Sequence, residues 1–92
     1  MIRVGLIIFK FYFPYIFSIK EHRKIMLKII SDIRKQNISV VEVLSDNIRS
    51  SSLCLSLVRE SEPDIHKLYD FYINFFLDRS DISLISYSIE IY

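Results

Sequence analysis

The 92-residue sequence has no tryptophan, one cysteine, one glycine and two prolines. A single cysteine, Cys54, cannot build an internal disulfide framework and fits a reducing cytosol. A single glycine, Gly5, lies alone in an apolar run, which excludes the glycine-rich loops that hold nucleotide phosphates. The shortage of glycine and proline also leaves little room for flexible linkers. We therefore expect one domain over residues 1–92.

Long apolar runs are missing as well. Residues 4–9 are apolar, but Lys10 and Pro14 interrupt the run well before the roughly 20 residues that a membrane-spanning helix needs. No small-residue cleavage site follows, so a secretory signal is not indicated either. The sequence thus predicts a cytoplasmic protein without a membrane segment.

Charge is unevenly distributed along the chain, although its net value is only +1. Residues 1–37 contain eight lysines or arginines and two acidic residues, whereas residues 38–92 contain four and nine. Such asymmetry favours a basic surface with a polyanionic partner. A basic helix packed beside an acidic helix would explain it without any partner, so both interpretations stay open at this point.

A first strand is predicted over residues 2–13, which are rich in β-branched and aromatic side chains. The odd positions form one wholly apolar face, which we expect in the core: Ile7, Phe9, Phe11 and Phe13. The even positions form a mixed face: Leu6, Ile8, Lys10 and Tyr12. Pro14 ends the strand, because it has no N–H for a ladder.

The most regular helical pattern follows Ser18. This serine is a good N-cap, and Glu21 three positions later completes an S-x-x-E capping box. Apolar residues then recur at helical spacing and predict the buried stripe of a helix that stops near Asn37: Ile19, Met26, Ile29, Ile30 and Ile33. Four basic residues fall mostly outside this stripe: Lys20, Arg23, Lys24 and Lys28.

The rest of the chain predicts three more strands, a second helix and one loop. They are a strand over residues 38–44, a loop over 45–52, a strand over 53–58, a helix that begins at Ser61 and ends near residues 78–80, and a strand over 86–91. The order β-α-β-β-α-β, with right-handed crossovers, predicts an α+β, ferredoxin-like sandwich. Its four-stranded antiparallel sheet would have strand order 4-1-3-2, two helices on one face and an uncovered second face.

Three segments of the chain match motifs of a known family. Residues 18–23, S-I-K-E-H-R, resemble a family segment S-L-K-E-K-R, while 41–43, V-E-V, and 87–91, Y-S-I-E-I, resemble A-E-V and Y-E-I-E-I. On these residues the chain resembles the YlxP-like family of small bacterial proteins over essentially its whole length. The resemblance implies a ferredoxin-like fold without established enzymatic activity. Genes of that family often stand beside those of translation initiation and ribosome maturation factors, which implies work linked to the ribosome or RNA.

Two positions depart from the family pattern. His22 stands where the family usually has lysine, and a histidine is only partly charged near neutral pH. Residues 48–50, I-R-S, replace the family's L-W-Q. A function that needs a large aromatic side chain in this loop is therefore not expected of this chain.

The basic residues of the first helix are the predicted site for phosphate or RNA: Lys20, Arg23, Lys24 and Lys28. Unpaired N–H groups at a helix start and nearby cations together attract phosphate. The alternative is an ordinary solvated basic face, because helix faces of this charge are common.

The uncovered sheet face is the second candidate surface. We expect a homodimer or protein interface there, formed by Leu6, Ile8, Tyr12, Val40 and Val58. Stacking of RNA bases is not expected on this face, because Tyr12 is its only aromatic residue.

No catalytic constellation is evident in the sequence. Cys54 reads as a packing residue, since both histidines are expected on helices and no metal-ligand spacing is present. The prediction is a non-enzymatic accessory protein, associated with the ribosome or RNA, that needs no cofactor or metal. The alternatives are a homodimeric adaptor and a small-anion enzyme, for which Arg23 and Asn47 are candidates by residue type alone.

Overall fold

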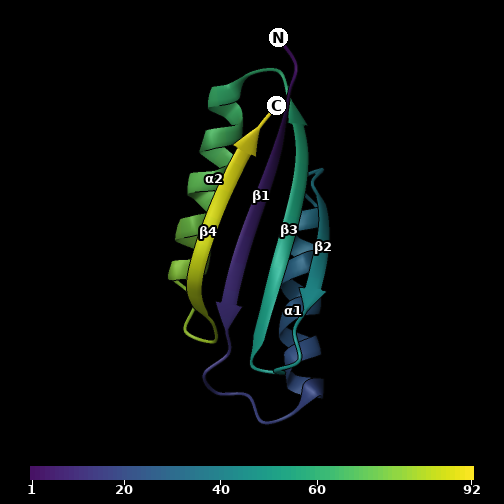
Figure 1. Ribbon diagram of the computed structural model, residues 1–92, viewed down its shortest axis with the longest axis vertical. Helices are drawn as coiled ribbons and strands as arrows, with labels where there is room; N and C mark the ends of the chain where they lie inside the picture. The colour runs from purple at the N-terminus through teal and green to yellow at the C-terminus, as the bar shows by residue number, and fades with distance from the viewer.

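The computed structural model describes residues 1–92 and contains six elements in the predicted order (Figure 1). They are β1 (Arg3–Tyr12), α1 (Ile19–Arg34), β2 (Ser39–Leu44), β3 (Ser50–Arg59), α2 (Glu62–Leu77) and β4 (Ser83–Ile91). The four strands form one antiparallel sheet in the order β2-β3-β1-β4, and both helices lie on one of its faces. The predicted ferredoxin-like α+β fold is confirmed. Neither helix combines the length and the apolar character that crossing a bilayer requires.

The core is built on the odd positions of β1, as the alternation of the sequence predicts. Ile7, Phe9, Phe11 and Phe13 are each at most 1% exposed. The rings of Phe9 and Phe11 meet Phe76 of α2 edge to face, with centroids 4.9 and 4.7 Å apart. Such edge-to-face pairs add to the stabilisation from area burial. This cluster attaches α2 to the central strand.

Gly5 permits a close approach of α2 to β1. A Cβ atom at this position would lie 2.7 Å from Cγ2 of Ile65, which is fully buried in the first turn of the helix. Real Cβ atoms essentially never come this close to another carbon. Any larger residue would therefore push the start of α2 away from the sheet.

The helix α1 begins as the capping box predicts. Ser18 Oγ accepts a hydrogen bond from Glu21 N at 3.3 Å, and Glu21 Oε2 accepts one from the N–H of Phe17 at 2.7 Å. Met26, Ile29 and Ile33 are buried, but Ile19 is 52% exposed. The expectation that Ile19 enters the core is wrong, because the first turn extends past the end of the sheet's apolar face. His22, one turn before Met26, is buried in its place.

The prediction that Val40 lies on the uncovered sheet face is also wrong. Val40 pairs with Leu55, which is fully buried, and is itself only 5% exposed, so it faces the helices. Its neighbour Val41 pairs with Cys54 and is 63% exposed on the other face. Both faces of β2 carry valine, so hydrophobicity alone could not determine which one is buried. Glu42 lies on the same face as Val40, where His22 and Ser51 contact its carboxylate.

β3 and β4 both begin three residues before their predicted starts. β3 begins at Ser50, so the loop after β2 spans only residues 45–49. β4 begins at Ser83, three residues before the predicted start, and contains a β-bulge. Lys10 pairs with Ser86 and the next residue of β1, Phe11, pairs with Leu84, which leaves Ile85 without a partner in β1. The helix α2 ends at Leu77 with Asp78 as its C-cap, as predicted.

Candidate phosphate-binding face and its groove

Three lysines form one exposed row along α1. Lys20, Lys24 and Lys28 follow one another at intervals of four residues, which places them on one side of the helix. All three are exposed, and none lies within ion-pair distance of a carboxylate. We call these residues the lysine row. Because none of the three ammonium groups is held in an ion pair, the row is available to an anionic partner.

Arg23, the fourth predicted cation, does not belong to this row. At 100° per residue it lies about 60° from Lys20, on the side away from the groove, and roughly 140° from Lys28. It lines a small hollow of about 80 Å³ together with Asn47. Asn47 Oδ1 accepts a hydrogen bond from the N–H of Arg49 at 2.9 Å, so its amide oxygen stabilises the loop. The hollow is smaller than the roughly 300 Å³ at which ligand sites begin.

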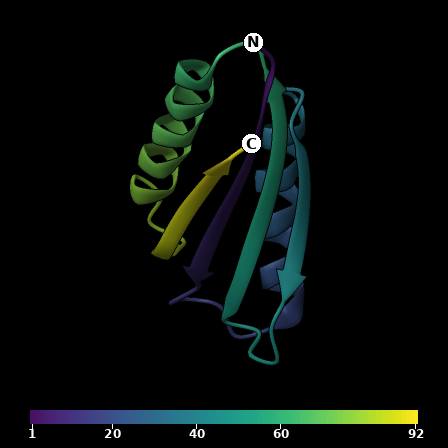
Figure 2. The ribbon, with the colours of Figure 1, turned by 45° about the horizontal axis from the view of Figure 1, so that its top comes forward.

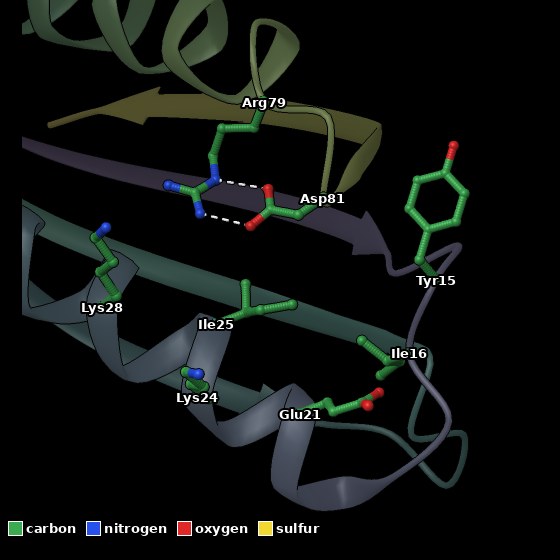
Figure 3. A pocket seen from close by; sticks show the side chains of 8 residues that line it. All are labelled: Tyr15, Ile16, Glu21, Lys24, Ile25, Lys28, Arg79 and Asp81. Atoms are coloured by element: carbon green, nitrogen blue, oxygen red, sulfur yellow. Dashed lines mark hydrogen bonds and ion pairs between the residues drawn. The ribbon is translucent and has the colours of Figure 1, made fainter.

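A groove of about 420 Å³ runs beside the lysine row (Figure 3). We call it the α1 groove. It is lined by two residues that follow β1, four residues of α1 and two that follow α2: Tyr15, Ile16, Glu21, Lys24, Ile25, Lys28, Arg79 and Asp81. Lys28 and Arg79 lie at one end of the groove, while Glu21 and Tyr15 lie at the other. The groove therefore places a third cation, which has no recognisable pattern in the sequence, opposite two of the predicted lysines.

Arg79 is held rigidly by Asp81. Its Nε and Nη2 atoms donate to the two carboxylate oxygens at 2.9 and 2.6 Å, and its guanidinium lies 5.6 Å from the ring centroid of Phe75. The hydrogen bond from Arg79 lowers the pKa of Asp81, and the charge of Lys28 lowers it further. The same hydrogen bond raises the pKa of Arg79, so the guanidinium remains charged. Its Nη1 edge makes no hydrogen bond within the protein and is free for a ligand.

His22 is not part of the basic surface, although it lies within the basic segment. It is 3% exposed, with its ring 4.6 Å from the ring centroid of Phe13. Nε2 lies 2.6 Å from Glu42 Oε2, and Nδ1 lies 2.5 Å from the carbonyl oxygen of Ile48. The sequence carried one signal for this: His22 continues the buried stripe four residues before Met26. His22 thus contributes a buried, hydrogen-bonded ring to this segment and no exposed cation.

The uncovered sheet face carries a row of small and apolar side chains. Strand pairing places Val41, Cys54 and Ile8 next to one another across three strands, and Val58 lies beside Val4. Val41 and Val58 are more than half exposed, whereas Ile8 and Cys54 are half-buried by their neighbours. Of the predicted interface residues, Leu6, Ile8, Tyr12 and Val58 lie on this face and Val40 does not. We call it the open sheet face.

The strand order and the shared helical face define a small α+β domain of ferredoxin-like fold, with a cationic groove on its helical side. The family described as "Protein of unknown function (DUF503)" matches residues 4–89, and the chain belongs to this family. No curated protein matches the sequence. The family description assigns no activity, so a function has to be argued from the surfaces described above.

Proposed function

We propose that this protein is a non-enzymatic accessory protein that binds RNA, free or in ribosomal particles, through the lysine row of α1. The observation that carries the proposal is the lack of an acidic partner for Lys20, Lys24 and Lys28. Three cations that follow one another at about one helical turn can contact several phosphates of one backbone, whereas an isolated lysine can contact only one. Arg79 lies across the groove, but its charge is balanced by Asp81, so it contributes an oriented N–H donor and no net charge.

The resemblance to YlxP-like proteins supports the same proposal. In that family the genes lie near those of ribosome maturation factors, and the S-L-K-E-K-R segment coincides here with the start of the lysine row. His22 removes one cation of that segment from the surface, because its ring is buried. The lysine row is unaffected by this exchange, since His22 lies on a different side of α1.

The proposal is tested by affinity capture of tagged protein at low and high salt, with ribosomal particles and RNA scored in the bound fraction. Phosphate contacts release counterions, so binding should fall steeply as salt rises. The Lys20→Ala/Lys24→Ala variant should bind more weakly, and its salt dependence should be shallower by roughly 0.7–0.9 in log–log slope for each phosphate that a lysine no longer neutralises.

The matched control is Lys10→Ala/Lys67→Ala, which removes the same charge from the open sheet face and from α2. This control should bind like the unchanged protein. If both double variants bind equally well, the lysine row is not the binding surface. If nothing binds at low salt, the RNA function itself is wrong.

A second candidate function rests on the open sheet face, and its proposed occupant is a second copy of this chain. Lys10 and Glu90 lie on this face on either side of the row that contains Ile8. A two-fold axis that runs across the strands at Ile8 would bring Lys10 of each copy beside Glu90 of the other. The apolar centre would then be covered on both copies. Such a homodimer leaves both lysine rows exposed and is compatible with RNA binding.

A further inference from the structure

We propose that the α1 groove holds one nucleotide of a single-stranded RNA, with the phosphate between Lys28 and Arg79 and the base on Tyr15. This inference rests on the proposed function and makes it specific: it names the form of RNA and the place where one nucleotide sits. It is carried by the order of chemical groups along the groove, which matches the order of groups in a nucleotide.

The cationic end of the groove has the features of a phosphate site. Arg79 is fixed by Asp81 along one edge and by Phe75 on one face, so its free Nη1 edge is already oriented before a ligand arrives. A guanidinium with a fixed orientation loses little freedom on binding, and it matches phosphate oxygens in geometry. Lys28 stands across the groove from it and Lys24 is next along α1. Asp81 is already neutralised by Arg79 and opposes phosphate binding less than a free carboxylate would.

The other end of the groove would repel a phosphate. Glu21 lines it, and one oxygen of its carboxylate is occupied by the N–H of Phe17. The remaining oxygen can accept a hydrogen bond from a ribose hydroxyl, which a phosphate cannot supply. Tyr15 stands at the mouth of this end and is 71% exposed, so one face of its ring can receive a base. The charges therefore give the nucleotide one orientation in the groove.

Single-stranded RNA fits this arrangement and duplex RNA does not. In an A-form helix the bases are stacked and paired, whereas in a single strand a base can turn outward onto an aromatic ring. The groove volume of about 420 Å³ is within the range of small-ligand sites. The lysine row alone would bind the phosphates of both forms equally. Only the groove distinguishes single-stranded RNA from duplex RNA.

The test measures fluorescence anisotropy with labelled oligouridylate, with the same oligomer annealed to oligoadenylate, and with uridine monophosphate as competitor. Tyr15→Ala should weaken single-strand binding roughly ten-fold, because one base loses the ring on which it stacks. Tyr15→Phe, which keeps the ring, should bind normally. Lys28→Ala should weaken single-strand binding more than Arg34→Ala, which removes the same charge from the last turn of α1. Duplex binding should not respond to Tyr15→Ala.

The outcomes separate this proposal from the one on which it rests. If Tyr15→Ala and Tyr15→Phe bind the single strand alike, while Lys20→Ala/Lys24→Ala weakens both probes, the groove proposal fails and the RNA function stands. If the unchanged protein binds neither probe, both fail. If uridine monophosphate displaces the labelled oligouridylate at a lower concentration than unlabelled oligouridylate does, the ligand is a free nucleotide and the proposal of an RNA strand is overturned.

Discussion

His22 and Glu42 form a hydrogen-bonded pair under the helical face of the sheet, with Nε2 of the histidine 2.6 Å from Oε2 of the glutamate. Ser51 Oγ donates to the same carboxylate oxygen at 2.5 Å. The carbonyl oxygen of Ile48 can only accept, so Nδ1 of His22 must carry a proton. The Nε2 contact joins the two side chains directly, and Ser51 shares the same carboxylate oxygen. The pair joins α1, β2, β3 and the hairpin loop at one point.

Loss of this pair should destabilise the protein substantially. We expect His22→Ala to lower the free energy of unfolding by about 2–4 kcal/mol, because Glu42 and the Ile48 carbonyl lose a buried donor. Glu42→Ala should cost a similar amount, and the double variant should cost less than the sum of the two. Urea denaturation measures all three. His66→Ala is the control, since this histidine is exposed on α2 and should change stability by less than about 0.5 kcal/mol.

Gly5→Ala should destabilise the protein through one specific contact. The new Cβ would overlap Cγ2 of Ile65, and overpacking of this kind costs about 1–3 kcal/mol. Ile65→Ala removes the opposing methyl group and costs about 2–5 kcal/mol by itself, because it leaves a cavity. The double variant Gly5→Ala/Ile65→Ala should therefore lose much less free energy of unfolding than the two single variants lose together. Thermal or urea unfolding measures this difference. Strict additivity would mean that the Gly5–Ile65 approach is not the cause.

The Arg79–Asp81 pair should make stability depend on pH on the acid side. The pKa of Asp81 is lower in the folded protein than its ordinary value of 3.8, chiefly because of the hydrogen bond from Arg79. The folded state therefore binds a proton less readily than the unfolded state. The pair stabilises fully well above pH 3.8, and its contribution is lost as the pH falls through the lowered pKa.

Asp81→Asn should reduce the loss of unfolding free energy that accompanies a fall in pH. Urea titrations at several values between neutral pH and about pH 3 measure this loss across the ordinary carboxyl pKa. The side chain of Asp81 is 38% exposed, so solvent screening should limit the effect to about 1 kcal/mol or less. Asp46→Asn, in the exposed hairpin loop, should leave the pH dependence of the unfolding free energy unchanged. An equal reduction in both variants would count against a special role of the Arg79–Asp81 pair.

The open sheet face should mediate self-association. Light scattering at high protein concentration should detect a dimer, and Val41→Lys should shift it to monomer, because the new charge would lie within the interface, in the row formed by Val41, Cys54 and Ile8. Leu27→Lys makes the same kind of change on the exposed side of α1 and should leave the dimer intact. A monomer at every accessible concentration of the unchanged protein would exclude this candidate function.

The sequence predicted the fold because local and global signals agree in most elements. Phe9, Phe11 and Phe13 alternate without exception, and the Ser18–Glu21 capping box marks the start of α1 unambiguously. β2 is the exception. Its glutamate is stabilised by Ser51 across the hairpin and by His22 of α1, and local alternation does not reveal such contacts.

The lysines of the candidate site could be selected from the sequence, but the groove could not. Lys20, Lys24 and Lys28 are recognisable by their helical spacing. Arg79 and Tyr15 carry no local pattern, since each lies at or beyond the end of a predicted element. They join the site only because the end of α2 and the end of β1 both lie beside the first turns of α1. That placement depends on the tertiary fold, which residue spacing does not encode.

The β-bulge at Ile85 has a consequence for how molecules of this protein can meet (Figure 2 shows β4 at one border of the sheet). A bulge breaks the regular spacing of outward-facing N–H and C=O groups along an edge strand, so a second strand cannot align with it over its whole length. The opposite border, β2, is only six residues long. Because of its bulge, the border at β4 resists the strand-to-strand addition that leads to fibrils. Sheets of neighbouring molecules are not expected to extend into one another through this border.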